Sequence, residues 1–507
     1  MPAPTAKTRR AGRKDRLAKR AAKPEVNPAA PGQIGGRYQP LSKAECEAIY
    51  ATALRLLAEL GMGEVPDRLA QDLCAAGAKA QGARILIPHA LTETAIACAA
   101  QRFVLHGRDP ARSIEIGGDR VFFGTGGAAV QTLDMDTGLY RPSTLRDLHD
   151  FTRLQDTLTN VSWFTRCCVA TDVPDNFDLD VNTAYALLRN TTKPVATSFT
   201  LAEHMDPIVE MLDIAAGGPG TFAERPFLKA HISPVISPMR YGEDAVDVVY
   251  AAIKHNMPMS CITAAQSGAT APATLAGFLA QSLAETLASL VMVHAIKPGH
   301  PMVFSNWPFV IDLRTGAFAG SGGEIAVLNA ASAQLTNWLG LPSGVAASMT
   351  DAKAIDAQYG AEKGITSLAA ALAGGNLIYE SSGMTASLLG ASFEGFVLDD
   401  EMHSATYRAL RGVEVTEENL GFEAICEAVL GEGHFLGGQH TYAAMERDYF
   451  YPTLADRDAP SAWEEKGAPD AWGRARHKAR EILETHHPTY LTPEQDAEIR
   501  RRMPILL

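Results

Sequence analysis

The chain has 507 residues, 46% of them apolar, which is enough to bury one large core or two to three ordinary ones. Acidic residues outnumber basic ones by 58 to 45, and the net charge of -13 gives the body no electrostatic reason to bind nucleic acid. The seven scattered cysteines form no CxxC pair, and no apolar run reaches the roughly 18 residues of a membrane helix. These features favour a cytoplasmic protein with reduced thiols and no metal site of its own, and they argue against a membrane protein.

Residues 1–36 differ in composition from the rest of the chain. Nine Lys or Arg residues fall between Lys7 and Lys23, with almost no large apolar side chain among them. Such a segment cannot bury enough surface to offset the entropy of ordering it, so we predict a disordered basic tail. Arg9 and Arg10 could suggest a twin-arginine export signal, but the apolar stretch that such a signal needs is missing.

The sequence pattern of residues 37–150 predicts a helical and hairpin region that precedes the main domain. A helix is expected from Ser42 to the residue before Gly61, because apolar residues recur at three- and four-residue spacing. Further helices are expected near 66–76 and 88–100. The apolar runs 121–123 and 128–133, joined by a glycine-rich turn, predict a β-hairpin.

Residues 151–412 alternate between strand-like apolar runs and segments with helical periodicity, such as 245–254, 275–296 and 322–339. Eight such units fit a (β/α)8 barrel, a TIM barrel of the α/β class, with a doubly wound open sheet as the competitor. No G-x-G-x-x-G motif opens a helix after a first strand, which disfavours a dinucleotide-binding sheet. The predicted strands are 161–170, 194–199, 227–233, 258–264, 301–305, 344–349, 376–380 and 393–398.

Residues 413–507 predict a helical, irregular region with an aromatic cluster that includes Tyr442, Tyr449 and Phe450. We expect it to pack on the barrel or on another subunit.

Polar side chains follow the predicted strands, at the barrel end where chemistry is usually placed. Asp351 and Lys353 follow the sixth strand and Glu380 the seventh, whereas Arg240 and Arg314 follow the third and fifth. Asp351 and Lys353 could also simply cap a helix and pair in solvent. The set lacks three histidines with metal spacing, a G-x-S-x-G elbow and a P-loop, which disfavours the chemistries that need them.

Aromatic residues recur beside these positions, among them Trp307, Phe309, Tyr359 and Tyr379. A quaternary ammonium group is a cation without a hydrogen-bond donor, so proteins hold it with aromatic faces and a nearby carboxylate. Trp307 with Glu380 would make such a site. Filling of the barrel interior is the commoner role of any single aromatic residue. The loop 266–272 is small enough for a large flat cofactor to approach.

Four long segments resemble the trimethylamine:corrinoid methyltransferase family. They are SGATAPATLAGFLAQSLAETLA at 267–288, SGGEIAVLNAASAQLTNWLGLPSGVAASMTDAKAIDAQYGAEKG at 321–364, NLIYESSGMTASLLGASFEGFVLDDEM at 376–402, and GGQHTYAAMERDYFYP at 437–452. The resemblance implies an oligomeric (β/α)8 enzyme that moves a methyl group from an amine onto the Co(I) of a separate corrinoid protein, whose cobalamin faces the barrel mouth.

The sequence contains only the twenty standard residues and therefore resembles the branch that lacks pyrrolysine, whose members demethylate quaternary amines such as glycine betaine. A quaternary amine has no lone pair for an electrophile to capture and is already activated by its fixed charge. At 359 and 361 the aromatic and small residues are exchanged relative to the expected pattern, which leaves the substrate open.

This interpretation assigns a role to each candidate residue. Glu380 or Asp351 would supply negative charge at the catalytic centre, and Arg240 or Arg314 would pair a substrate carboxylate. Two alternatives remain: a methyltransferase using another donor such as a sulfonium compound, and a non-catalytic barrel that binds a betaine. The substrate would contact Trp307, Phe309, Tyr359, Tyr379 and Asn306, and the corrinoid would approach Gln266, Ser267, Gly268 and Thr270.

Overall fold

Eight parallel strands close into a barrel in the computed structural model, which describes residues 27–507. The strands follow the ring in the order β10-β11-β14-β16-β19-β20-β6-β9, so the chain closes the barrel where β20 pairs with β6. The bounds are β6 (Phe122–Gly124), β9 (Val161–Thr165), β10 (Val195–Thr197), β11 (Leu228–Ile232), β14 (Met259–Thr263), β16 (Met302–Asn306), β19 (Ser343–Ala346) and β20 (Leu377–Tyr379).

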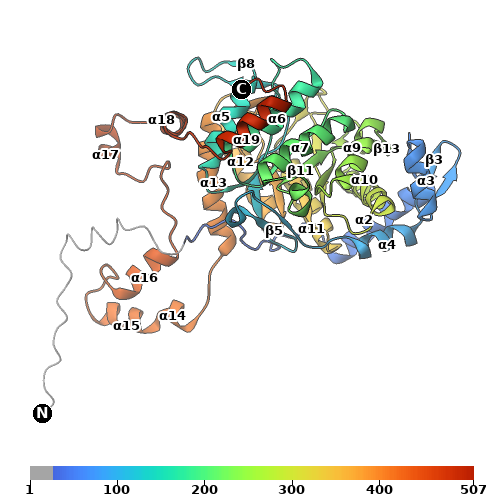
Figure 1. The fold of residues 1–507 in the computed structure, drawn as a ribbon. Helices are drawn as coiled ribbons and strands as arrows, with labels where there is room; N and C mark the ends of the chain where they lie inside the picture. Colours follow the sequence, from blue (N-terminus) through green and yellow to red (C-terminus); the bar gives the residue numbers. More distant parts are fainter. Residues whose placement is uncertain (1–26) are drawn as a thin grey trace, which may run out of the picture.

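One helix follows each barrel strand and packs on the outside of the ring (Figure 1). The helices are α5 (Leu145–Asp156), α6 (Asn176–Asn190), α7 (Met205–Ala216), α9 (Glu243–Lys254), α10 (Leu275–Ile296), α11 (Gly323–Trp338), α12 (Ala357–Leu372) and α13 (Phe393–Arg411), with the short α8 (Thr221–Glu224) after α7. The order of strands and helices confirms the predicted (β/α)8 barrel.

One predicted strand and one predicted hairpin are wrong. Residues 393–398 open helix α13, where Phe393, Phe396 and Val397 are buried at helical spacing and Ser392 caps the first turn. The first barrel strand is β6 instead, although residues 121–133 were expected to form a hairpin. β6 pairs with β20 and β9, and β7 (Gln131–Leu133) pairs with β8 (Tyr140–Pro142) and β22 (Gly390–Ser392). A short apolar run does not distinguish a strand from a buried helical turn, which explains the first error. The second error concerns pairing, because the apolar pattern locates β6 and β7 but does not show that their partners lie elsewhere in the chain.

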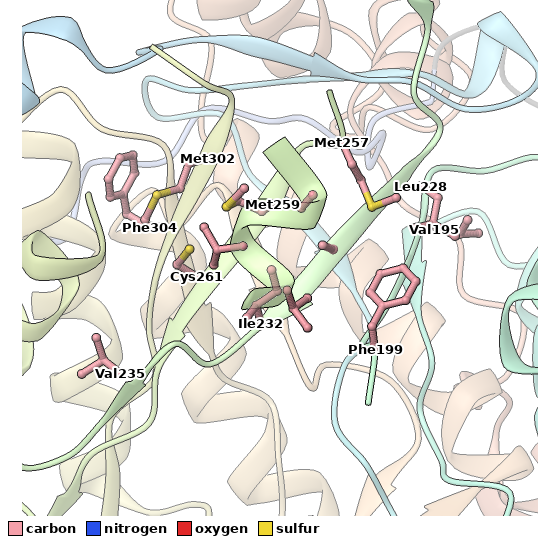
Figure 2. Close-up of a cluster of buried hydrophobic side chains, with 14 of the residues drawn as sticks. Val195, Phe199, Leu228, Ile232, Val235, Met257, Met259, Cys261, Met302 and Phe304 are labelled. Atoms are coloured by element: carbon pink, nitrogen blue, oxygen red, sulfur yellow. The ribbon is translucent and has the colours of Figure 1, made fainter. Parts of the chain in front are cut away.

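The largest core layer lies between the strands and the surrounding helices. Figure 2 shows part of it, where Leu228, Ile232, Met259 and Cys261 of neighbouring strands lie among other buried apolar side chains. Helix α10 is long and apolar enough to span a membrane by composition, but 83% of its apolar window is buried here, as in a core helix. The barrel is therefore a packed body that holds its strand ends rigidly.

The N-terminal region packs on the outside of the barrel and against the amino ends of its strands. Helices α2 (Lys43–Arg55), α3 (Asp67–Ala75) and α4 (His89–Cys98) match the expected positions, and a five-residue π-helical turn extends α2 to Leu60. Leu105 and Ile116, from the hairpin of β4 (Phe103–Leu105) and β5 (Ile114–Ile116), pack against the interior side chains of the barrel. A small outer sheet joins β1 (Met62–Gly63), β2 (Lys79–Gln81), β3 (Arg84–Leu86), β12 (Val235–Ile236) and β13 (Arg240–Tyr241).

The predicted basic tail meets the described part of the chain at residue 27, and residues 1–26 lie outside it. Residues 27–36 are not a disordered tail. Ala29 is buried, Gly32 N donates to Val121 O at 3.0 Å, and Ile34 forms a bridge with Arg120. This segment packs beside the start of β6, because its backbone groups find partners there.

Beyond α13 the chain forms an arm that projects from the barrel and then returns (Figure 1). The arm contains α14 (Glu417–Leu420), α15 (Phe422–Leu430), α16 (Gln439–Arg447) and α17 (Pro460–Glu465). The returning helices are α18 (Ala471–Thr485), which packs on α13 and α5, and α19 (Pro493–Arg502), which packs on α7.

Candidate active site

The carboxyl ends of the barrel strands meet at one mouth, and Glu380 stands there directly after β20. Its side chain is fully buried, and neither carboxyl oxygen has a hydrogen-bond partner. Burial raises the pKa of Glu380 to about 8, although the positive charges of Lys363 and Arg166 oppose that rise. A buried carboxyl group without a partner is costly, which marks this position as one adapted to a ligand.

The neighbouring turn after β6 is shaped around this carboxyl group. A Cβ added to Gly126 would stand 3.0 Å from Oε1 of Glu380, and one added to Gly127 would stand 2.5 Å from Oε2. The backbone of Glu380 itself has a φ of 59°, a left-handed conformation that costs about 1 kcal/mol for a residue other than glycine. The two glycines therefore leave the space that this acidic side chain occupies.

Four rings from three strands and one strand end form an aromatic cluster inside the barrel, defined here as Trp163, His231, Trp307 and Tyr379. The ring of Tyr379 lies 4.5 Å from Trp163 and 5.0 Å from Trp307, and His231 lies 5.4 Å from Trp307. The indole Nε1 atoms of both tryptophans and Nδ1 of His231 have no hydrogen-bond partner. A Cβ added to Gly126 would stand 3.0 Å from Oε1 of Glu380 and 3.2 Å from Cδ1 of Tyr379, so the unpaired carboxyl group lies next to this cluster.

A polar network lies within the barrel beside the aromatic cluster. The Nζ of Lys229 donates to the hydroxyl of Tyr379 at 3.1 Å, and that hydroxyl lies 2.5 Å from Oγ of Ser260. Burial lowers the pKa of Lys229 to about 7, and burial together with the charges of Lys229 and Arg166 holds the pKa of His231 well below its usual value. A neutral His231 is therefore expected beside any bound cation, which avoids repulsion.

The mouth is covered by two small sheets. One contains β15 (Gln266–Ser267), β17 (Phe309–Ile311) and β18 (Phe318–Ala319), and the other joins β7, β8, β21 (Met384–Thr385) and β22. Between β21 and β22, Ala386, Ser387 and Leu388 all have positive φ angles of 51° to 73°. Leu388 packs against the apolar cluster that contains Trp307, so this strained turn covers the site.

Asp351 connects the two small sheets through hydrogen bonds. Its Oδ1 accepts hydrogen bonds from the backbone N of Gly320 and from Oγ of Ser387, both at 2.7 Å. The carboxylate thus joins the loop after β18 to the strained turn after β21. The structure gives Asp351 a positioning role of its own, and the predicted catalytic role stays a prediction.

Tyr359 lies in a buried network behind the strand ends and not in the aromatic cluster. Its hydroxyl donates to Asp399, whose Oδ2 also accepts from Gly383 N at 2.7 Å and from Lys363 Nζ at 2.8 Å. Lys363 further donates to the carbonyl of Ser348 at 2.7 Å. This network ties the loops after β19 and β20 together, so it supports the position of Glu380 from outside the barrel.

The structure does not bring the two predicted carboxylate-binding arginines into the site. Arg240 belongs to β13 of the outer sheet and pairs with Glu64 at 3.0 Å, and Arg314 is exposed and pairs with Asp312 at 2.9 Å. Each arginine follows a barrel strand in sequence, but a short β-element carries its side chain away from the mouth.

The other predicted substrate- and corrinoid-binding residues take different positions relative to the aromatic cluster. Phe309 lies 6.4 Å from Trp307 at the edge of the mouth, whereas Asn306 points outward and donates to Ser282 of α10 at 3.1 Å. Residues 266–270 form a tight turn, in which Gln266 N donates to Thr270 Oγ1 at 2.9 Å and Ser267 Oγ to Pro272 O at 3.2 Å. At Gly268, with a φ of 91°, an added Cβ would stand 2.5 Å from a methyl carbon of Leu313.

Sequence reasoning missed Lys229 and His231. They occupy alternate positions of the run FLKAHIS at 227–233, which places both on one face of a strand. Two polar residues with period two in an otherwise apolar strand indicate a polar barrel interior, and this signal was available. No group of three or more His, Cys, Asp and Glu side chains within residues 27–507 could hold a metal ion.

Known proteins similar to this chain are methyltransferases. The chain is 29% identical to a glycine betaine methyltransferase of Desulfitobacterium hafniense strain Y51, over 92% of this chain and 97% of that protein. It is 30% identical to a trimethylamine methyltransferase of another D. hafniense strain and 29% identical to one of Methanosarcina barkeri, each over 90% of this chain and 92% of the relative.

Among solved structures, a dihydropteroate synthase from Xanthomonas albilineans covers 61% of this chain and 100% of its own at 14% identity, with a TM-score of 0.36, which is too low to bear on the site. The family of trimethylamine methyltransferases matches residues 9–503, nearly the whole length. The barrel, its mouth and this match together show that the chain belongs to the trimethylamine methyltransferase family.

Proposed function

We propose that this protein transfers a methyl group from a quaternary amine to the Co(I) of a corrinoid carried by a separate protein. The observation that carries the proposal is the unpaired, buried carboxyl group of Glu380 beside the aromatic cluster. Aromatic faces and one carboxylate match a cation that has no hydrogen to donate. The identity to a glycine betaine methyltransferase supports the same substrate class.

The chemistry requires positioning more than proton transfer. When the methyl carbon leaves, the C–N bond breaks and both of its electrons stay on nitrogen, so the other product is a neutral tertiary amine. The corrinoid supplies the Co(I) nucleophile that takes up the methyl group. The aromatic cluster and Glu380 orient the donor so that one N–CH3 bond faces the mouth.

Positive charge on the amine disappears during the reaction, and the site should therefore hold the cation only moderately. A fully ionised carboxylate in a dry cage would favour the bound substrate over the transition state. The raised pKa of Glu380 is consistent with this requirement, because the protein makes its ionisation costly. A bound ammonium group draws the carboxyl toward its charged form, and the departing charge releases it.

Corrinoid contact at the mouth is supported by the position of the turn 266–270. Parallel pairing of β15 with β17 places Gln266 opposite Phe309, at the edge of the aromatic cluster. The exposed Gly268 presents no side chain there. We infer that Gln266, Ser267, Gly268 and Thr270 form the face toward which the corrinoid protein presents its cofactor.

Methyl transfer can be measured directly. The purified protein is mixed with Co(I) cobalamin and candidate quaternary amines, and methylcobalamin absorbance is followed, with Glu380→Gln as a control. Turnover with a quaternary amine supports the proposal. Turnover only with a sulfonium donor would assign the other donor class, and saturable betaine binding without turnover would identify a binding protein.

Two further expectations belong to this proposal. All seven cysteines are free thiols, which suits the reducing cytoplasm that Co(I) chemistry needs. A homo-oligomer stays a prediction. The arm exposes Val413, Phe422 and Leu430 at 87%, 66% and 87%, apolar surface that a second copy could cover. Light scattering of the purified protein would give its mass.

A further inference from the structure

Arg166 is the arginine that stands at the barrel mouth. It follows β9 directly, as Glu380 follows β20, and only β6 separates these two strands in the ring. Each charge affects the other, because Arg166 lowers the pKa of Glu380 and Glu380 raises that of Arg166. Part of the side chain remains accessible to solvent, yet burial lowers the pKa of its guanidinium. Arg166 is thus half-buried at the strand end, neither enclosed in the core nor free on the surface.

The guanidinium of Arg166 has no partner. Within residues 27–507 it forms no hydrogen bond and no ion pair at 4.0 Å or less. Asp180 is a nearby acidic group, but its oxygens already accept from Thr200 N at 2.7 Å, Thr200 Oγ1 at 2.9 Å and His204 Nδ1 at 2.8 Å. None of its nitrogens is buried away from solvent, so the five N–H donors of this half-buried guanidinium are free to bind a ligand.

The geometry points to a zwitterionic substrate. We propose that Arg166 binds the carboxylate of a betaine whose quaternary ammonium group lies against Glu380 and the aromatic cluster. This inference rests on the proposed function and adds the substrate class: a methylated amine that also carries a carboxylate. It reassigns to Arg166 the role that the sequence suggested for Arg240 or Arg314.

The spacing suits a short betaine. Strands lie about 4.8 Å apart, so residues after β20 and β9 start about 10 Å apart across β6. Glu380 and Arg166 do not form an ion pair with each other, although their charges are opposite and close enough to interact. A gap between two opposite charges is complementary to a molecule that carries the reverse pair a few bonds apart. Glycines 126 and 127, between the two strand ends, leave the intervening backbone without side chains.

Binding measurements without any corrinoid test this inference. Isothermal titration calorimetry would compare glycine betaine with choline, which shares the trimethylammonium group but carries a hydroxymethyl group in place of the carboxylate. We expect the wild type to bind glycine betaine at least tenfold more tightly than choline. We expect Arg166→Gln to weaken the binding of glycine betaine about 10- to 100-fold, which is the range for a lost charge-assisted bidentate contact. The affinity for choline should change less than about threefold.

Two further variants make the result specific. Arg166→Lys keeps the charge but loses the planar fork, and should fall between wild type and Arg166→Gln. Arg314→Gln removes an exposed arginine whose partner is Asp312 and should bind both ligands like the wild type. Thermal melting of each variant confirms folding before titration.

The possible failures are distinguishable. If Arg166→Gln lowers the affinity for both ligands equally, or lowers neither, the proposed role of Arg166 is overturned. The proposed methyl transfer from quaternary amines could still be correct in that case. Reduced turnover with unchanged betaine affinity would also overturn it and would place Arg166 on the corrinoid side. Failure of the wild type to bind either ligand would count against the proposed function itself.

Discussion

The carboxyl group of Glu380 lies so close to Gly127 that a Cβ at this glycine would stand 2.5 Å from Oε2. We expect Gly127→Ala to displace the carboxyl group and to reduce kcat/KM for methyl transfer at least tenfold. Gly138→Ala is the matched control, because Gly138 also has a positive φ, 69° against 90°, but an added Cβ there meets nothing within 4 Å. Equal effects of the two substitutions on activity would show that backbone strain alone is responsible.

Glu380→Gln should change how stability depends on pH. The pKa of Glu380 is about 8 in the folded protein against an ordinary value of 4.5, so its contribution to stability is fully present below about 4.5 and is lost as pH rises to 8. The loss approaches about 4 kcal/mol for this fully buried group. The glutamine of the variant does not titrate. We therefore expect the melting temperature of Glu380→Gln, relative to that of the wild type, to rise by a few degrees between pH 5 and pH 8.

The same variant should lose methyl transfer at every pH, because the amide cannot supply negative charge. In the wild type, binding of a quaternary amine should release a proton from Glu380 and should become tighter as pH rises toward 8. Calorimetry in buffers of different ionisation enthalpy measures that proton. The other titratable groups that interact electrostatically with Glu380 or belong to the aromatic cluster and its polar network are Arg166, Cys167, Lys229, His231, Lys363 and Tyr379. A proton release that persists in Glu380→Gln would assign the titration to one of them.

Trp307 should contribute to recognition of positive charge and not only to shape. We expect Trp307→Leu to raise the KM of glycine betaine about 3- to 30-fold, the range for a desolvated cation–π contact. Inhibition by 3,3-dimethylbutanoate, which has the same shape without the positive charge, should change much less. Trp338→Leu serves as a control, since Trp338 packs edge-on against Tyr50 at 5.7 Å on the outer helix α11. An equal change for both ligands in Trp307→Leu would mean that Trp307 only fills space.

Asp351 can be tested for charge against position. Asp351→Asn keeps an oxygen acceptor for Gly320 N and Ser387 Oγ, whereas Asp351→Ala removes it. If the side chain acts by joining the two loops through hydrogen bonds, the kcat/KM of Asp351→Asn should stay within about threefold of the wild-type value. The kcat/KM of Asp351→Ala should fall at least tenfold, as expected for two lost hydrogen bonds. Ser387→Ala, which removes one of the two, should lie between them. Comparable losses in Asn and Ala would restore the role of Asp351 as a source of negative charge.

Much of the architecture was predictable because it depends on local patterns. The helical spacing from 245–254, 275–296 and 322–339 placed α9, α10 and α11 within two residues of their observed ends. The eighth unit was predictable only in part. Phe393 and Phe396 form a stretch too short to separate strand from helix, and the three residues of β6 gain their stability from pairing with β20, about 250 positions later.

The sequence by itself determined that polar residues follow barrel strands and that Trp307 and Glu380 stand among them, because hydrophobic periodicity locates strand ends without knowledge of their neighbours. Only the tertiary structure decided which charged groups share the mouth. Arg240 and Arg314 find acidic partners on small outer elements, whereas Arg166 and Glu380 remain unpaired across β6. The physical reason is that strand pairing around a closed ring, and the burial that follows from it, joins residues more than 200 positions apart.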